Sequence, residues 1–316
     1  MSPVFFFMVI FYWLFLSGSV FLAGSFIIKQ LVTAPSGADF CIVKERGRCF
    51  GEVSLSIIFF VSLLTFLLNI VHLYFHASVM TETPLQETAS VFSVFLAKTK
   101  YGRLGLFRTA FLILLSIIVF SCMRKPKGWK NITGTLLSLL LLISLSMSSH
   151  QAIKGYQSIP FYIDIIHIVS ISIWIGGIFF IRLCYSFFLK EKAVEYWKIF
   201  QGMITRFSNI ATIAVYIAGA TGITLAFVRV KNSSILLNTI YGRVFLLKLM
   251  VVLTIFLLGG LNKFYVLPKL FSIENATNEK SIGYKKLLYR FITFEAVAGL
   301  LAIFLTAILT HLSPEG

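Results

Sequence analysis

Eight apolar segments, each about 20 residues or longer, constrain this chain more than any other feature of its sequence. They cover residues 4–28, 54–79, 104–122, 132–150, 161–188, 207–228, 243–265 and 290–311. A helix of about 20 apolar residues crosses the hydrocarbon core of a bilayer, whereas an open strand edge leaves backbone groups unsatisfied in lipid. We therefore predict an all-α fold, a polytopic membrane helix bundle of about eight transmembrane helices, in a single integral membrane domain over residues 1–316.

The composition agrees with a membrane protein and argues against other classes. Of the 316 residues, 58% are hydrophobic and only 13% are charged, whereas soluble domains carry about 25% charged residues. The net charge of +16 does not indicate nucleic acid as a partner, because the basic residues lie in short connections where they face lipid headgroups. Nothing in the chain resembles an ATPase nucleotide site, and we expect no enzymatic activity and no catalytic residues.

The basic residues also predict the orientation of the chain. Most of the 28 Lys and Arg residues lie in or beside the connections that follow the first, third, fifth and seventh segments. Short connections rich in Lys and Arg stay on the cytoplasmic side. We expect a multi-pass protein of the plasma (inner) membrane with both termini outside.

Two landmarks recur in the same order and predict an internal repeat. Tyr101-Gly102-Arg103 opens the third segment and Tyr241-Gly242-Arg243 opens the seventh, while His150 ends the fourth and His311 the eighth. Four spans per unit would make the two units parallel. The expected halves are residues 1–150 and residues 151–316.

The five histidines of the chain all fall in the outer part of the predicted bundle. They are His72, His76, His150, His167 and His311. His72 and His76 are four residues apart and share one helix face. Ionisable groups inside a membrane are costly and mark functional sites, although a single histidine at a helix end is more often an interfacial residue than a ligand.

Two methionines and one aspartate extend this candidate site. Met80 follows His76 by four residues and Met147 precedes His150 by three, so each thioether shares a helix face with an imidazole. Imidazole and thioether together suit Cu(I), which prefers soft ligands. Asp164, one turn before His167, is placed to orient that imidazole by a hydrogen bond. Each methionine taken alone is more simply explained by packing.

The fifth segment also contains a packing motif, and the cysteines lie at the other end of the bundle. Trp174, Gly176 and Gly177 form a Trp-x-Gly-Gly run, and small residues let a second helix approach closely. The four cysteines are Cys41, Cys49, Cys122 and Cys184. By the expected topology they face the cytoplasm, where thiols stay reduced, and the role of Cys41 and Cys49 stays open.

These residues resemble the copper resistance D family of inner-membrane proteins. The run from His167 to Gly177 is similar to the His-x6-Trp-x-Gly-Gly signature of that family. The later motifs that resemble it are Tyr241-Gly242-Arg243, Lys248, Gly259-Gly260-Leu261-Asn262-Lys263, Pro268, Arg290, Glu295 and Leu309 to Pro314. The resemblance covers residues 161–314 well and the first four segments more weakly. It implies copper transport from the periplasm into the cytoplasm, and copper homeostasis or resistance, beside a periplasmic copper-binding partner.

Two functions therefore compete at this stage. In the first, copper, as Cu(I), binds the outer His/Met site and crosses between the two halves. In the second, the protein is a b-haem electron-transfer protein, because haem bundles use two histidines on facing helices at equal depth. His72 or His76 with His150, or His167 with His311, are the candidate haem ligands. In a third interpretation, the protein is an accessory subunit and its histidines are interfacial residues that bind neither copper nor haem.

Overall fold

The computed structural model describes residues 3–33, 44–45, 48–124, 128–149, 152, 155–188, 194–229, 233–272 and 279–312. Eight helices in these ranges are long and apolar enough to cross a membrane: Pro3–Thr33, Gly51–Thr81, Lys100–Arg124, Gly128–Ser146, Ile159–Ser186, Trp197–Arg229, Ile240–Phe271 and Lys280–His311. They confirm the prediction of an all-α, polytopic membrane helix bundle with eight spans.

Most spans are continuous α-helices, and short π-helical segments interrupt some of them. The first part of the chain forms α1 (Pro3–Ile28), which continues as η1 (Lys29–Thr33), then α2 (Phe50–Thr81), α3 (Thr88–Lys98), α4 (Lys100–Arg124) and α5 (Gly128–Ser146). The second part forms α6 (Ile159–Ile171), η4 (Ser172–Gly176), α7 (Gly177–Phe188), α8 (Val194–Arg229), α9 (Ser233–Asn238), α10 (Ile240–Leu261), η5 (Asn262–Val266), α11 (Leu267–Phe271) and α12 (Glu279–His311). Two short strands, β1 (Lys44–Glu45) and β2 (Arg48–Cys49), pair antiparallel between α1 and α2.

The predicted bounds of several spans need correction. The helices α8 and α12 begin at Val194 and Glu279, well before the apolar segments 207–228 and 290–311. Their additional turns carry polar residues such as Lys285, which are good helix formers but are not apolar, so hydropathy finds only the part of each helix that lies in hydrocarbon. In contrast, α5 ends at Ser146, before the predicted end at residue 150.

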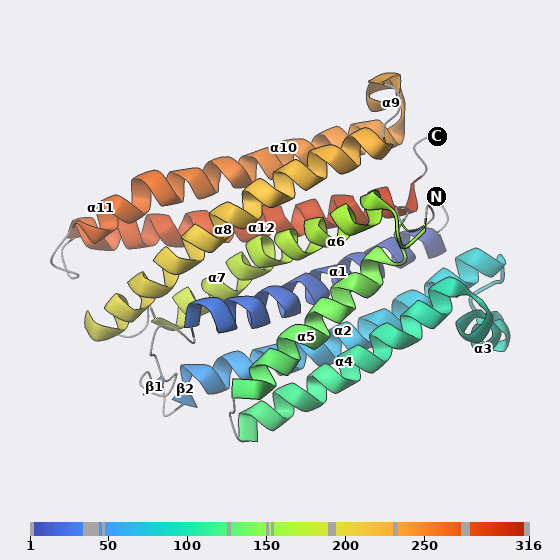
Figure 1. The fold of residues 1–316 in the computed structure, drawn as a ribbon, viewed down its shortest axis with the longest axis horizontal. Coiled ribbons are helices and arrows are strands. Elements are labelled where there is room, and N and C mark those ends of the chain that lie inside the picture. Colours follow the sequence, from blue (N-terminus) through green and yellow to red (C-terminus); the bar gives the residue numbers. More distant parts are fainter. Residues whose placement is uncertain are drawn as a thin grey trace.

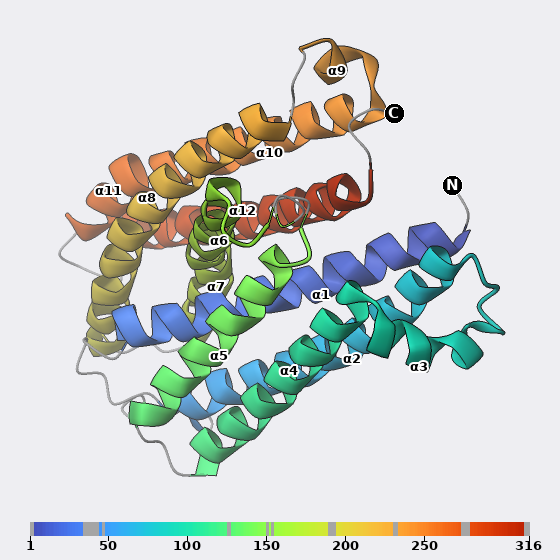
Figure 2. The same cartoon turned by 45° about the vertical axis from the view of Figure 1, so that its right-hand side comes forward.

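The first helix, α1, lies at the centre of the bundle. It packs against α2 and α5, and also against η4, α7 and α12. In both Figure 1 and Figure 2, α2 and α4 lie on one side of α1, and α10 and α12 lie on the other. Side chains around the helix, including Phe15, Leu22 and Phe26, are fully buried. Phe6, Phe7 and Leu14 are exposed, so the neighbouring helices cover a large part of α1 but not its whole surface.

Glycines allow α1 and η4 to pack backbone against backbone. A Cβ atom on Gly176 would lie 2.3 Å from the carbonyl oxygen of Val20, and one on Gly24 would lie 2.4 Å from the carbonyl oxygen of Ser172. Backbone atoms cannot move aside as a flexible side chain can. The contact therefore requires glycine at both positions.

The structure places the other two residues of the Trp-x-Gly-Gly run beside this contact. Trp174 is 5% exposed. A Cβ atom on Gly177 would lie 2.5 Å from the ring of Phe207 on α8. The run thus brings its π-helical segment against α1 on one side and α8 on another.

The helices α4 and α10 begin in the same way. The Thr99 hydroxyl accepts a hydrogen bond from the Gly102 N–H at 2.9 Å, and the Thr239 hydroxyl accepts one from the Gly242 N–H at 3.0 Å. The shared motif is therefore Thr-x-Tyr-Gly-Arg, in which the threonine satisfies an unpaired N–H group of the first turn. This common helix start supports the predicted repeat of two four-helix halves, which stays a prediction.

One end of the bundle gathers the elements that carry the histidines. The C-terminal ends of α2 and α12 lie there, together with the N-terminal ends of α4, α6 and α10 (Figure 1, right). We call it the histidine end, defined by His72, His76 and His311. The helix α3 packs against α2 and α4 at this end. Cys122 and Cys184, near the C-terminal ends of α4 and α7, are buried free thiols.

We predict that the α1–η4 contact decides the stability of the bundle. Replacing Gly176 by alanine should force α1 and η4 apart and lower the free energy of unfolding by about 1–3 kcal/mol, the usual cost of overpacking. Thermal unfolding of the purified protein in detergent measures this effect. Gly259→Ala on α10 is the matched control, because no atom lies within 4 Å of its added Cβ. Equal melting temperatures for the two variants would contradict the prediction.

Candidate metal centre

Three of the predicted histidines form a compact group at the histidine end. The group joins His72 and His76 on α2 with His311, the last residue of α12, and one ring nitrogen from each lies within 4.8 Å of the others. His72 is completely buried, and His76 and His311 are partly buried. Helix periodicity puts the first two on one face of α2, and α12 adds the third from across the bundle.

Backbone carbonyl groups fix the protonation pattern of two of these rings. His72 Nδ1 lies 3.3 Å from the carbonyl oxygen of Met8, and His311 Nδ1 lies 2.8 Å from that of Ala307. A carbonyl oxygen only accepts, so each Nδ1 carries the proton and donates it. Metal-binding histidines commonly donate one N–H to a carbonyl in this way, which leaves the lone pair on Nε2.

Two tyrosines form the walls of the group. The ring centroid of Tyr12 lies 4.9 Å from that of His72 and 5.1 Å from that of His311. Tyr101 stacks on His76 at 4.0 Å, and its hydroxyl lies 2.9 Å from His72 Nε2. Because His72 Nε2 has the lone pair, the Tyr101 hydroxyl donates to it and occupies the position that a metal ion would take.

A buried arginine adds a fixed positive charge beside the histidines. Arg108 is fully buried, and its Nη2 donates to the Ser144 carbonyl at 2.8 Å and to the Ser148 hydroxyl. The guanidinium carbon lies 5.4 Å from the centroid of the Tyr101 ring. The arginine therefore anchors the end of α5 to α4 and holds Tyr101 against the histidines.

The group fits a metal ion after a small rearrangement. Nitrogens that bind one ion at about 2.0 Å lie roughly 3.4 Å apart, which is closer than the 4.8 Å limit seen here. Metal binding would therefore require rotation of the rings and release of the Tyr101 hydroxyl from His72. His76 Nδ1 is buried and has no hydrogen-bond partner among the described residues, so it offers an unused lone pair or N–H at the site.

The fourth described histidine lies in a different environment. His167 Nδ1 is 3.1 Å from the Ala218 carbonyl oxygen and 3.0 Å from the Thr221 hydroxyl, both on α8. Asp164, which was expected to orient His167, instead accepts a hydrogen bond from Ser149 at 2.9 Å. The physical reason is that the end of α5 and the face of α8 lie against different sides of α6 and supply nearer partners.

Two basic residues complete this second set, which we call the α6 polar group. Its members are Asp164, His167, Arg229, Lys248 and Tyr241. Asp164 interacts electrostatically with Arg229 and Lys248, and Lys248 also acts on His167. The Arg229 guanidinium lies 5.1 Å from the centroid of the Tyr241 ring. Charged side chains at membrane depth that face one another in this way are commonly functional.

The remaining predicted ligands are Met80, Met147 and His150. Met80 lies in the last turn of α2 with 56% of its side chain exposed. Met147 is partly buried just beyond the end of α5. His150 and Cys41 lie outside the described residues, and of Cys49 the structure describes the backbone alone.

Sequence reasoning missed the residues that surround the histidines. Arg108 carried a usable signal, because a charge inside an apolar segment needs a partner, and Tyr101 belonged to the repeated motif. Tyr12 and the Met8 carbonyl had no local signal, since α1 meets α2 and α12 only in the folded bundle.

The fold and the site together define a polytopic membrane protein with a buried histidine cluster, suited to a metal ion, at one end of its bundle. Two family models match the chain. "Copper resistance protein D" matches residues 201–309, and "Copper resistance protein D-like, N-terminal domain" matches residues 1–158. The chain therefore belongs to the copper resistance D family, and its first four spans, where the sequence resemblance was weaker, are included.

A characterised relative is the copper transport protein CutJ of Bacillus subtilis (strain 168). It is 26% identical over 170 residues, which cover 53% of this chain and 31% of CutJ. The matched region is thus about a third of that relative's length. No solved structure matches the chain.

We predict that the three-histidine group, and not the histidines in general, binds Cu(I). His72→Ala, His76→Ala and His311→Ala should each weaken Cu(I) binding at least tenfold, about 1.4 kcal/mol, because each removes one of three ligands. Anaerobic titration against a chromophoric chelator measures the affinity. His167→Ala is the matched control and should retain the parental affinity. If all four variants lose Cu(I) affinity equally, or if none of them loses affinity, the three-histidine group is excluded as the binding site.

Proposed function

We propose that this protein imports copper across the plasma membrane and so serves copper homeostasis or resistance. The observation that carries the proposal is the group of His72, His76 and His311, whose ring nitrogens lie within 4.8 Å of one another at one end of a membrane-spanning bundle. Membership of the copper resistance D family supports copper as the metal. The metal is cargo here, so the site must both bind it and release it.

Charge and ligand type favour Cu(I) over Cu(II). Neutral imidazoles suit several metals, but the fixed charge of Arg108 lies beside the site. Coulomb repulsion scales with the charge of the ion, so a monovalent ion is repelled half as strongly as a divalent one. Met80 and Met147, near the same end of the bundle, are further soft ligands for an arriving or departing Cu(I) ion.

The arrangement of the site argues against the b-haem alternative. Haem ligation needs two imidazoles on opposite sides of a flat macrocycle. Here the rings of Tyr12 and Tyr101 pack at 4.9 Å and 4.0 Å from the rings of His72 and His76, which leaves little room for a macrocycle beside these histidines. The family comparison also supports copper rather than haem.

The α6 polar group lies on the next part of the route. His167 belongs to it, and α6 adjoins both α5 and α8. A copper ion that leaves the three-histidine group along α6 meets an imidazole beside a carboxylate and two cations. We assign His167 a role in passage of the ion, after binding.

The histidine end faces the outside in this proposal. That orientation follows from the excess of Lys and Arg in the connections at the opposite end and puts both termini outside. A periplasmic copper-binding protein is then the expected donor, because it would meet the site directly. The predicted halves, residues 1–150 and 151–316, would each supply part of the route.

We predict that replacing His167 impairs copper transport but not copper binding. In proteoliposomes that contain a Cu(I) indicator, His311→Ala should lose both copper binding and uptake. His167→Ala should keep binding and lose at least nine-tenths of the uptake rate, since it acts after the ion is bound. Lipid vesicles without protein give the background. Parental uptake in His167→Ala would remove this residue from the route, and no uptake by the parental protein would contradict import.

We predict an outside location for the C-terminus. A reporter that is active only in the periplasm, fused after Gly316, should be active, and the same reporter fused in the connection between α7 and α8 should be inactive. The positive-inside rule is the physical reason. The reverse pattern would turn the histidine end toward the cytoplasm and make the site one for export or release.

A further inference from the structure

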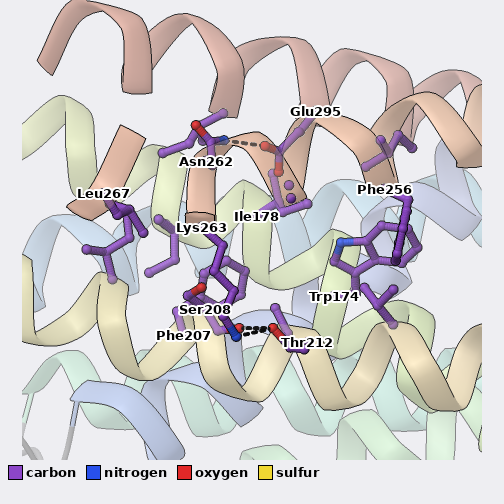
Figure 3. A pocket seen from close by; sticks show the side chains of 18 of the residues that line it. Trp174, Ile178, Phe207, Ser208, Thr212, Phe256, Asn262, Lys263, Leu267 and Glu295 are labelled. Atoms are coloured by element: carbon purple, nitrogen blue, oxygen red, sulfur yellow. Dashed lines mark hydrogen bonds between the residues drawn. The ribbon is translucent and has the colours of Figure 1, made fainter. Parts of the chain in front are cut away.

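A second polar site lies inside the C-terminal part of the bundle, away from the histidine end. It is a cavity of about 130 Å³ between α7, α8, α10, η5 and α12 (Figure 3). One water needs about 10–15 Å³ of such space, so the cavity has room for several. Its walls are mainly apolar, and the polar side chains that line it include Glu295, Asn262, Lys263, Ser208, Thr212 and Tyr216.

Glu295 is the feature that makes this cavity unusual. It lies in the middle of α12, is 5% exposed, and precedes His311 by a length of helix equal to roughly 24 Å. Asn262 Nδ2 donates a hydrogen bond to Glu295 Oε1, while Asn262 Oδ1 is buried without a partner among the described residues. The π-helical segment η5 begins at Asn262, and such segments often occur at functional sites.

The charged side chains on the elements around Glu295 form hydrogen bonds with residues other than Glu295. On η5, the Lys263 ammonium lies 2.7 Å from the Thr212 hydroxyl on α8. On α7, the Arg182 guanidinium donates to Thr293 at 2.9 Å and also to Tyr289. Other titratable groups lie on the neighbouring elements. On α8, Tyr216 lines the same cavity. Tyr185 on α7 donates to the Lys285 carbonyl oxygen, Lys269 on α11 lies 4.0 Å from the ring of Tyr265, and α12 itself carries Tyr284 and Arg290.

Glu295 thus has no ion-pair partner in the part of the chain that the structure describes. A carboxylate without a counter-charge is costly inside a membrane, whereas the protonated carboxyl group is neutral. The carboxylate and carboxamide oxygens of Glu295 and Asn262 differ from the imidazole nitrogens at the histidine end, which suit copper and other transition metals.

A second hollow lies beside this cavity, toward the opposite end of the bundle. It measures about 160 Å³ and shares Ser208, Lys263 and Leu267 with the first. It continues to Pro268 and Phe271 on α11, where the helix ends. Water that fills the two hollows would link Glu295 to the end of the membrane away from the histidines.

We propose that Glu295 is a proton-binding site and that its proton is released to the inner side as Cu(I) enters. This inference rests on the proposed copper import. In the step, the neutral carboxyl group gives one proton to water in the hollows and becomes a carboxylate, and a proton from the outer side restores it in the next cycle. One Cu(I) and one proton move in the same direction, so an inward proton gradient drives uptake.

The test uses proteoliposomes with a Cu(I) indicator and a pH indicator inside. With the outside more acidic, uptake by the parental protein should rise at least fivefold, and added copper should acidify the lumen. In Glu295→Gln, uptake should no longer respond to the gradient and the copper-induced acidification should vanish. Cu(I) affinity at the histidine end should stay unchanged in this variant. Glu52→Gln, an exposed carboxylate in the first turn of α2, is the matched control and should behave as the parent.

The outcomes separate the two proposals. Parental uptake that ignores the proton gradient, follows a sodium gradient, or still responds to pH in Glu295→Gln overturns the proton site and leaves import standing. If the parental protein shows no uptake, the import proposal fails. Infrared difference spectra between acidic and alkaline pH then test separately whether Glu295 binds a proton. A protonated carboxyl band that the parental protein shows and Glu295→Gln lacks supports the proton site. If Glu295→Gln shows the same band, the proton site is overturned. Glu295→Asp, which keeps the carboxyl group, should retain coupling and covers the case in which Glu295→Gln does not fold.

Discussion

The backbone contact between α1 and η4 determines the position of everything else in this bundle. Gly24 and Gly176 let the two segments approach so closely that a methyl group on either would meet the other's backbone. Because α1 is nearly straight and central in Figure 1, fixing it here also fixes its first turns. Those turns supply the Met8 carbonyl and the Tyr12 ring to the histidines. The close contact at Gly24 and Gly176 thus sets the geometry of the three-histidine group, which lies at a different depth of the membrane.

The bilayer supplies the second constraint, since a buried polar group in lipid must find its partner within the protein. Arg108 binds the end of α5, His72 binds a carbonyl of α1, and Asp164 binds Ser149. These contacts join different segments of the chain, and that of His72 joins α2 to α1 across 64 positions of the sequence. Several buried polar atoms of the described residues lack a hydrogen-bond partner, and three of them lie at the two proposed ion sites: His76 Nδ1, Arg108 Nη1 and Asn262 Oδ1.

The sequence predicted the eight spans because the hydropathy of a span is a local property, and it predicted the shared end of His72, His76 and His311 because helix direction alternates along the chain. It did not predict how these residues are partnered. Spacing suggested that Asp164 orients His167, but side-chain partners depend on which helix lies against which face, and α5 and α8 take those faces. For the same reason the sequence did not indicate that Tyr12 packs against the histidines. Family matching helps only partly, since His72 and His76 lie in the region matched by the N-terminal model, whereas His311 lies just beyond residue 309, where the match to the other model ends.

One helix, α12, carries both ion-binding chemistries, and this explains how they can act together. His311 presents imidazole nitrogen at its last turn, and Glu295 presents carboxylate oxygen at its middle, roughly 24 Å away. A direct electrostatic effect over that distance is weak, so coupling between the sites must be mechanical. The Tyr101 hydroxyl has to leave His72 before a metal enters, and the rings must close by more than 1 Å. A small shift of α12 that brings His311 inward also moves Glu295 against Asn262 and the hollows. Because α12 packs on α1, α7 and α10, such a shift is a sliding of whole packed helices, which transmits a change at one depth to the other without any intervening chain of charged groups.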